Sequence, residues 1–587
     1  MKFFLGRKAA IVTALCLLAA PFVSGPAAAA SNDDGESLET WAGGSHSGSY
    51  LAGRFASRQR DYDYASRFFE SLLSLDPGNP RLLNRAFLLF VSTGQWPKAD
   101  ELARRIARGQ PKNRLARMVL GLSAAANGKF RIAREHFKAS AHTPLSELSA
   151  AMLMAWARAG ERDLAAALKE LKRLDKHESF ASFKNFHSAL IADMLGSPAR
   201  AEKLYALAWK DVSGSLRITQ AYGSFLRRHG KPNKAREVYK GFLSSAPENA
   251  IIRAALADLE AGREARPIVR NATDGMAEAL FSIASGLTDE RNVDIALLYV
   301  RMALRMRPDF PIGWMLLGEI YETMGKYAKA IDAYRKVPKD HPLNLAAGIQ
   351  VALALDDLKR TREAEALLHE LIARNPRAYK PLLTLGNILR SHKRWLEAED
   401  AYSRALARMG PPRPRHWTIY YFRGIANERA GRWPQAEADF RLALKLNPDH
   451  PSVLNYLGYS LIDRGRNLDE ALNMVKKAVE ARPGDGYIVD SLGWAYYRLG
   501  RYEDAVKQLE RAVELRPDDP VINDHLGDAY WRVGRRLEAR FQWLHALDFK
   551  PEPQDRKRIE HKLKHGLDAA IDGARKNDKT AIGGGNG

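Results

Sequence analysis

Residues 485–518 read DGYIVDSLGWAYYRLGRYEDAVKQLERAVELRPD, and this stretch decides the fold. Small residues recur where two helices would cross, large apolar residues lie beside them, and a proline follows the second apolar run. Small residues let two helix backbones approach, large side chains fill the space beside them, and proline cannot continue a helix. The stretch therefore predicts one helix–turn–helix hairpin, formed by Leu492, Gly493, Tyr496, Gly500, Tyr502, Ala505, Leu509, Ala512 and Pro517.

This hairpin recurs along the chain with a period of 34 residues. A proline closes each unit, with spacings of 34, 34, 72, 35, 34 and 34 residues, at Pro308, Pro342, Pro376, Pro448, Pro483, Pro517 and Pro551. A small residue of the first helix follows the same period at Ala284, Gly318, Ala352, Gly386, Gly424, Gly458, Gly493 and Gly527. Because two independent sets of residues agree, a stacked array of hairpins is predicted.

In this pattern the chain resembles the tetratricopeptide-repeat family, whose repeat is also 34 residues long. The resemblance implies an all-α solenoid of about 14 helix–turn–helix units, about six before residue 248 and about eight after residue 276. Between these two groups of units the 34-residue period is lost, which favours two superhelical segments. The alternative is a single decorated repeat that carries a long loop. The predicted parts are a signal peptide at 1–30, looser repeats at 31–247, an irregular joint at 248–276, clear repeats at 277–552, a capping helix at 553–577 and a flexible tail at 578–587.

The first thirty residues are predicted to form a cleaved secretory signal. A basic start precedes an apolar run, and small residues at 27–30 suit cleavage before Ser31. The alternative is a lipoprotein signal at Cys16, but Thr13 and Leu15 occupy the positions where a lipobox has leucine and a small residue. The run is too short for a membrane span, and no later stretch approaches the roughly 20 apolar residues that a span needs. We therefore expect a soluble periplasmic protein.

The sequence is strongly basic, and its one cysteine lies within the predicted signal. The formal net charge is +22. A mature chain without thiols excludes disulfides, thiolate catalysis and cysteine-ligated metals. For an exported protein the charge favours a weak association with anionic envelope surfaces, or acidic partners, over nucleic acid. The alternative is solvated arginine and lysine on the outer helix faces.

Motifs for catalysis are missing from the sequence. It contains no phosphate-binding loop, no H-E-x-x-H pair and no G-x-S-x-G nucleophile. His561 and His565 lie four residues apart, but no third ligand is near, which favours solvated side chains over a metal site. We expect a protein-binding scaffold without enzymatic activity, cofactor or metal.

In tetratricopeptide folds the first helix of each hairpin lines a concave groove, and the resemblance places a set of side chains there. Aromatic residues recur together with carboxylates or amides one repeat apart, which suits an extended or helical peptide of basic or neutral character. The alternative is that Trp494 and Trp531 pack between units while the acids cap helices. The candidate partner-binding residues are Asn455, Tyr459, Asp490, Trp494, Tyr497, Arg498, Asp524, Asp528, Trp531 and Arg532.

Three runs resemble a narrower family of exported repeat proteins: LNYLGY at 454–459, DSLGW at 490–494 and HLG at 525–527. That family is the lipoprotein binding partner of a carboxyl-terminal processing protease, and the likeness is tightest over residues 417–547. It implies an adaptor that docks a periplasmic protease and presents cell-wall hydrolases to it. Those adaptors are lipid-anchored, whereas this chain lacks a convincing lipobox. A second interpretation is a component of an envelope assembly or polymer-export complex.

Overall fold

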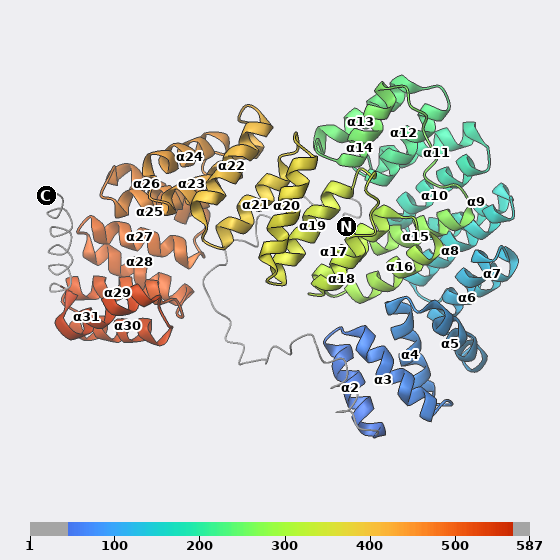
Figure 1. Ribbon diagram of the computed structural model, residues 1–587, viewed down its shortest axis with the longest axis horizontal. Coiled ribbons are helices and arrows are strands. Elements are labelled where there is room, and N and C mark those ends of the chain that lie inside the picture. Colours follow the sequence, from blue (N-terminus) through green and yellow to red (C-terminus); the bar gives the residue numbers. More distant parts are fainter. Residues whose placement is uncertain (1–44, 568–587) are drawn as a thin grey trace. The chain divides into compact units, whose positions relative to one another are not determined.

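The computed structural model describes residues 45–567, and Figure 1 shows them as a succession of helices. The regular elements in this range are all helical. The predicted signal peptide at 1–30 and the predicted tail at 578–587 lie outside the described residues. The contacts divide the chain into two compact units, with the boundary between Leu367 and Leu368.

Unit 1 is built from short helices that follow one another in pairs. They are α2 (His46–Arg58), α3 (Tyr62–Leu75), α4 (Pro80–Thr93), α5 (Trp96–Gly109), α6 (Arg114–Ala126), α7 (Phe130–Lys138), α8 (Pro144–Gly160), α9 (Leu164–Leu171), the 3-10 helices η1 (Lys172–Lys176) and η2 (Glu178–Phe180), α10 (Ala181–Met194), α11 (Pro198–Asp211), α12 (Leu216–Arg228), α13 (Pro232–Ser245), α14 (Ala250–Glu260), α15 (Ala272–Ala284), α16 (Val293–Met306), α17 (Pro311–Thr323), α18 (Tyr327–Tyr334) and α19 (Asn344–Asp357).

Unit 2 continues the same plan beyond α20, which spans the boundary between the units. The helices are α20 (Thr361–Arg374), α21 (Lys380–Ser391), α22 (Trp395–Met409), the 3-10 helix η3 (Pro414–His416), α23 (Trp417–Arg429), α24 (Trp433–Leu446), α25 (Pro451–Asp463), α26 (Leu468–Ala481), α27 (Gly486–Arg498), α28 (Tyr502–Leu515), α29 (Pro520–Arg532), α30 (Arg536–Asp548) and α31 (Pro553–His565). In the described range six helix pairs precede α14 and eight follow it, which confirms the predicted number of units.

A glycine in the first helix and a ring in the second set the spacing of the hairpins. A Cβ atom on Gly223 would lie 2.1 Å from the ring of Tyr239, and one on Gly527 would lie 2.5 Å from the indole of Trp543. Both rings are fully buried. Because no side chain fits at these crossings, the small residues recur with the period of the hairpin.

A single helix interrupts the period in unit 1. After α14 the chain runs without helix over residues 261–271, as the loss of the repeat predicts. This link is anchored, because the Ser224 hydroxyl donates a hydrogen bond of 2.7 Å to the carbonyl of Arg266. The predicted joint at 248–276 therefore lies inside unit 1, and the division between the two units falls later, after Leu367.

The predicted joint lies inside unit 1 because α15 and α16 pack back onto the earlier hairpins. α15 packs against α8 and α10, and α16 packs against α4 and α6, so both lie against first helices. A Cβ atom on Gly275 would lie 2.2 Å from the indole of Trp156 in α8. The hydroxyl of Tyr299 lies 2.7 Å from that of Ser149. This hairpin therefore occupies part of the concave side of the N-terminal repeats, where a partner groove would otherwise be open.

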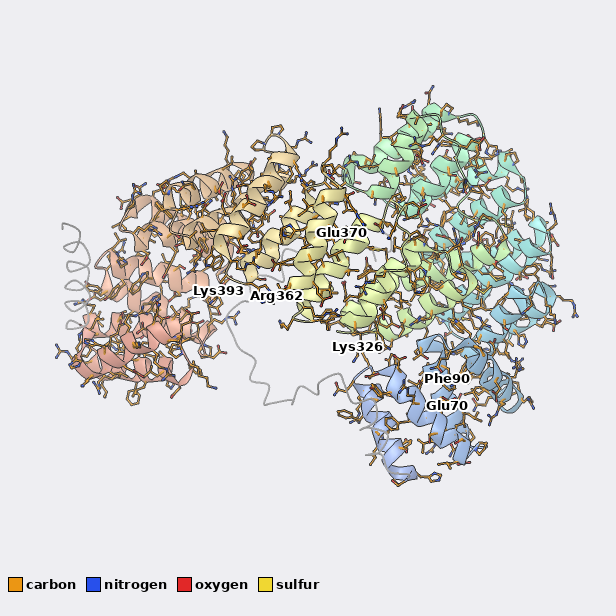
Figure 2. All side chains as sticks on the ribbon, viewed as in Figure 1. Glu70, Phe90, Lys326, Arg362, Glu370 and Lys393 are labelled. Atoms are coloured by element: carbon orange, nitrogen blue, oxygen red, sulfur yellow. The ribbon has the colours of Figure 1, made fainter. Side chains whose placement is uncertain are left out.

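Ion pairs fasten this contact at its edge. Arg305 of α16 donates hydrogen bonds of 2.8 and 2.6 Å to Asp100 of α5, 205 residues earlier in the sequence. Within the first hairpins, Lys98 pairs with Glu70 and lies over the ring of Phe90; the last two are labelled in Figure 2. Long-range charge pairs thus connect the two ends of unit 1.

A buried histidine lies beneath the docked hairpin. The indole nitrogen of Trp156 donates a hydrogen bond of 3.1 Å to Nδ1 of His187, and the His187 side chain is fully buried. Nδ1 is therefore the accepting nitrogen of a neutral imidazole. Burial lowers the pKa of His187 to about 4, although the nearby charge of Glu278 opposes this effect.

We expect this histidine to make unit 1 acid-sensitive. Between about pH 6.5 and about pH 4 the unfolded chain binds a proton at His187 that the folded chain does not, so the free energy of unfolding should fall by about 3 kcal/mol as the pH drops. Chemical unfolding of the natural chain and of His187→Gln at neutral and mildly acidic pH measures the effect. The variant should lose less stability on acidification; equal losses would contradict the assignment.

Candidate functional site

The predicted site residues lie on three consecutive first helices of unit 2, namely α25, α27 and α29. Side chains one repeat apart contact each other. Arg498 forms an ion pair of 3.3 Å with Asp463 on α25. From α29, Nε of Arg532 donates a hydrogen bond of 3.4 Å to the hydroxyl of Tyr497 on α27. The repeat therefore places this set on one common face, as the periodicity predicted.

An aromatic stack forms the centre of this face. The indole of Trp494 is parallel to the ring of Tyr497, with centroids 4.7 Å apart, and to the imidazole of His525, with centroids 4.1 Å apart. Trp494 Nε1 and Asn455 Oδ1 are shielded from solvent and have no hydrogen-bond partner in the described structure. The stack thus combines a large apolar area with an unsatisfied donor and an unsatisfied acceptor.

Asp490 is buried against this stack and paired within the chain. Its Oδ1 lies 2.9 Å from Nδ1 of His525 on the next first helix. Burial alone would lower the pKa of His525, but the charge of Asp490 and the hydrogen bond between them raise it above its ordinary value. The two residues therefore form a buried hydrogen-bonded pair that connects α27 to α29, and Asp490 does not present a free carboxylate.

Asp524 and Asp528 are likewise buried, and their counter-charge comes from the last helix. Asp524 is 1% exposed and Lys562 of α31 is 3% exposed. The Lys562 ammonium donates hydrogen bonds of 2.8 and 2.9 Å to Asp524 and of 2.8 Å to Asp528. Arg558 adds a hydrogen bond of 2.9 Å to Asp524, and the Trp543 indole donates one of 3.0 Å to Asp528.

The two buried carboxylates share one ammonium. Burial, together with the charge of Asp524, raises the pKa of Asp528 to about 6, although Lys562 opposes this rise. Burial would also raise the pKa of Asp524, but the charges of Lys562 and Arg558 hold it below its ordinary value. The acids expected to grip a partner are thus occupied by the chain's own basic helix, because an unpaired buried carboxylate would be costly.

The remaining predicted residues differ in how much of each residue is exposed to solvent. Tyr459, Asn455 and Tyr497 are half-buried and Arg498 is exposed. Trp531 packs against Trp543 of the same hairpin, with ring centroids 5.4 Å apart. The accessible part of the predicted face is therefore its α25–α27 half, whereas the α29 half lies beneath α31.

Two family models match the repeats of this chain. One, described as a tetratricopeptide repeat, matches residues 84–139, 282–344, 351–414, 383–451 and 423–486, and the other, described as a TPR repeat, matches residues 493–534. Together they span about half of the chain. The chain belongs to the tetratricopeptide-repeat family. Such repeats are protein-interaction scaffolds.

Individual relatives of this tetratricopeptide-repeat chain match only in part. A TPR repeat-containing protein of Pseudomonas aeruginosa is 29% identical over 189 residues, which are 32% of this chain and 31% of the relative. Anaphase-promoting complex subunit 3 of Schizosaccharomyces pombe is 24% identical over 187 residues, 32% of this chain and 27% of the relative. The chain thus spans about a third of the length of these relatives.

Solved structures share the helical repeat architecture at low identity. The APC/C hetero-tetramer Cut9–Hcn1 aligns with a TM-score of 0.37 and 16% identity, over 90% of this chain and 98% of that one. Yeast Tom70 aligns with a TM-score of 0.31 and 14% identity, over 90% of this chain and 96% of that one.

Among the described residues of this tetratricopeptide-repeat chain, none of the helices is long and apolar enough to cross a bilayer.

Sequence reasoning missed the residues that neutralise the predicted acids, namely His525, Arg558 and Lys562. Lys562 belongs to a charged helix that was expected to be a polar cap with solvated side chains. Its position three residues after the buried Ile559 places it on the inner face of α31. A lysine on the apolar face of a helix, beside repeats with unpaired acids, was the signal that could have identified this contact.

A second open surface lies on the N-terminal repeats in unit 1. A cavity of about 470 Å³ lies along the first helix α4, beyond the part that α16 covers, and is lined by Pro80, Arg81, Asn84, Arg85, Leu88 and Gln110. Two exposed arginines in a concavity suit an acidic side chain of a partner.

Proposed function

We propose that this chain is an exported scaffold or adaptor that binds partner proteins on the concave face of unit 2. The observation that carries the proposal is the aromatic stack of Trp494 and Tyr497, beside the exposed Arg498. Rigid aromatic rings give large contact area at little cost in conformational entropy, and arginine adds directed hydrogen bonds.

The chemistry of this face fits a peptide segment. Trp494 Nε1 lacks an acceptor and Asn455 Oδ1 lacks a donor. A peptide backbone supplies both a carbonyl and an N–H group, and it would satisfy these shielded atoms by displacing the side chains that cover them. The neighbouring acids Asp524 and Asp528 already bind Lys562 of the chain's own helix α31, so the proposal does not rest on them.

The finer form of the proposal rests on the sequence resemblance at 454–459, 490–494 and 525–527. In that form the chain is a periplasmic adaptor that docks a processing protease and presents cell-wall hydrolases to it. Scaffolds of repeat hairpins are generally non-catalytic, and we propose no enzymatic role here. The second form is a component of an envelope assembly or polymer-export complex, which the same groove would serve.

A pull-down from envelope extract distinguishes the two forms. The full mature chain is used as bait, and the captured proteins are identified by mass spectrometry. A protease together with hydrolases supports the adaptor, and a synthase or secretion pore supports the assembly component. If neither group is enriched over a bait that carries Trp494→Ala, the groove does not bind partners of either kind.

Removing the central indole is expected to weaken binding of the captured partner. Trp494→Ala should cost about 2 kcal/mol or more, the range of aromatic hot spots, because the stack loses its largest ring. Isothermal titration with the purified partner measures the loss. Lys507→Ala, on the outer face of α28, is the matched control and should bind normally. The melting temperature of each variant is checked, since undiminished affinity of folded Trp494→Ala would place binding elsewhere.

Export is a separate proposal and has its own test. The small residues before Ser31 and the poor lipobox at Cys16 predict a mature chain that begins near Ser31. Mass spectrometry of the protein purified from its native cells should give an unmodified amino terminus at that position. A diacylated Cys16 would instead establish a lipoprotein.

A further inference from the structure

The outer face of the last hairpin differs from that of the hairpins before it. On α30, Leu537, Phe541 and Leu544 are 69%, 60% and 49% exposed. Their spacing of four and three residues places them in one stripe along the helix. The equivalent positions one and two repeats earlier are charged or polar: Glu503, Lys507 and Glu510 on α28, and Asp469, Asn473 and Lys476 on α26.

The stripe is not part of the hairpin core. The residues of α30 that pack inward are Ala539, Trp543 and Ala546, which are fully buried on the opposite side of the helix. Two leucines and a phenylalanine exposed together on a surface that is otherwise charged are typical of a contact site. Phe549, which follows α30, is also exposed and extends the apolar surface.

Cations border the stripe. Arg540 lies three residues after Leu537 and four before Leu544, and therefore flanks the stripe along its length. Arg536 and Lys550 flank its two ends, and all three cations are exposed. None of the three forms an ion pair within the described part of the chain; Arg540 donates a hydrogen bond of 2.7 Å to the carbonyl of Leu563. Two acids lie on the same helix: the exposed Asp548 at its end, and Glu538, whose side chain is 47% exposed and pairs with Arg535.

We propose that this stripe docks the C-terminal end of unit 2 on an anionic lipid surface. An outward face with leucine and phenylalanine beside arginine and lysine is the composition that lies in a membrane interface. A bound peptide would leave the row of unpaired cations beside the stripe without a partner unless the peptide were itself acidic. A symmetric contact between two copies would bring the same arginines together, which like charges oppose. The net charge of +22 further favours an anionic surface.

Vesicle sedimentation with the full mature chain tests the proposal. We expect binding to vesicles of equimolar phosphatidylglycerol and phosphatidylcholine, and little binding to pure phosphatidylcholine. Leu537→Ser with Phe541→Ser should weaken binding by about tenfold or more, because the apolar area is lost. Arg536→Gln with Lys550→Asn should weaken it as well and reduce its salt dependence. Glu503→Ser with Lys507→Ser, at the exposed positions of α28 equivalent to Leu537 and Phe541, is the matched control and should bind as the natural chain does.

The following outcomes would overturn the proposal. Unchanged vesicle binding by folded Leu537→Ser with Phe541→Ser would place lipid contact elsewhere, and absence of binding to anionic vesicles would exclude it. Sedimentation velocity is run in parallel on the same proteins. If the serine substitutions dissolve a dimer without changing vesicle binding, the stripe is a self-association face. The substituted residues are exposed, so circular dichroism should remain that of the natural chain.

Discussion

Replacing Glu278 with alanine should destabilise unit 1 by about 3–5 kcal/mol, because it leaves a buried guanidinium without its counter-charge. Glu278 of α15 is fully buried, and Arg217 of α12 is nearly so. Nε of Arg217 donates a hydrogen bond of 2.7 Å to one carboxylate oxygen, and Nη2 donates one of 2.5 Å to the other. This bidentate pair fixes the docked hairpin α15–α16 to the earlier repeats.

Hydrogen exchange of the full chain measures this effect region by region. In Glu278→Ala the amides of α15 and of its neighbours α8 and α10 should exchange faster by at least two orders of magnitude, since about 1.4 kcal/mol is a factor of ten. The double variant Arg217→Met with Glu278→Leu removes both charges and should recover most of the protection. If α15 in Glu278→Ala is as protected as in the natural chain, the pair does not hold the hairpin in place.

The repeat architecture could be predicted because its determinants are local. A small residue of the first helix meets a large side chain about half a repeat later. That side chain is a ring where Gly223 meets Tyr239 and Gly527 meets Trp543, and it is aliphatic where Gly493 meets Leu509. The same spacing recurs in every unit, so the period is visible in one sequence. The loss of the period before residue 272 likewise marked α14 and the irregular link that follows it.

The docking of α15 and α16 could not be predicted, because its determinants are distant and occur once. Ser149 meets Tyr299 across 150 residues, and Asp100 meets Arg305 across 205. Neither pair recurs with the 34-residue period, so the sequence pattern does not indicate either contact. A sequence whose period stops and restarts is therefore compatible with a moving joint and with a segment that folds back, and only the contacts distinguish the two.

The candidate site shows the same division between local and distant determinants. The periodicity placed Asn455, Trp494 and Tyr497 on consecutive first helices, and the structure brings their face together. It did not show that Asp524 and Asp528 already have a partner, because Lys562 belongs to a helix outside the repeat period. The contribution of the aromatic face to partner binding stays a prediction.

Replacing Lys562 with methionine should free the last helix and destabilise the end of unit 2 by about 3–5 kcal/mol. Methionine fills a similar volume but removes the ammonium, which leaves Asp524 and Asp528 buried side by side, with Arg558 bonded to Asp524 and the Trp543 indole to Asp528. Hydrogen exchange of α31 and α29 should increase at neutral pH. Lys564→Met, on the exposed side of α31, is the matched control and should leave the exchange unchanged.

The pH dependence of the Lys562→Met variant provides the stricter test. Two buried carboxylates without the ammonium both have raised pKa values, and an acid whose pKa is raised on folding adds stability as the pH falls toward its unfolded value. Acidification from neutral pH to about pH 5 should therefore restore protection of α31 in the variant. In the natural chain a smaller gain is expected in this window, because Asp528, with its pKa of about 6, binds a proton there, whereas Lys562 and Arg558 hold the pKa of Asp524 below its ordinary value. At neutral pH the released acids should also be open to a basic peptide added in solution. If the variant keeps α31 protected at neutral pH, or loses protection further on acidification, then Lys562 does not neutralise these acids and α31 is held by its apolar contacts alone.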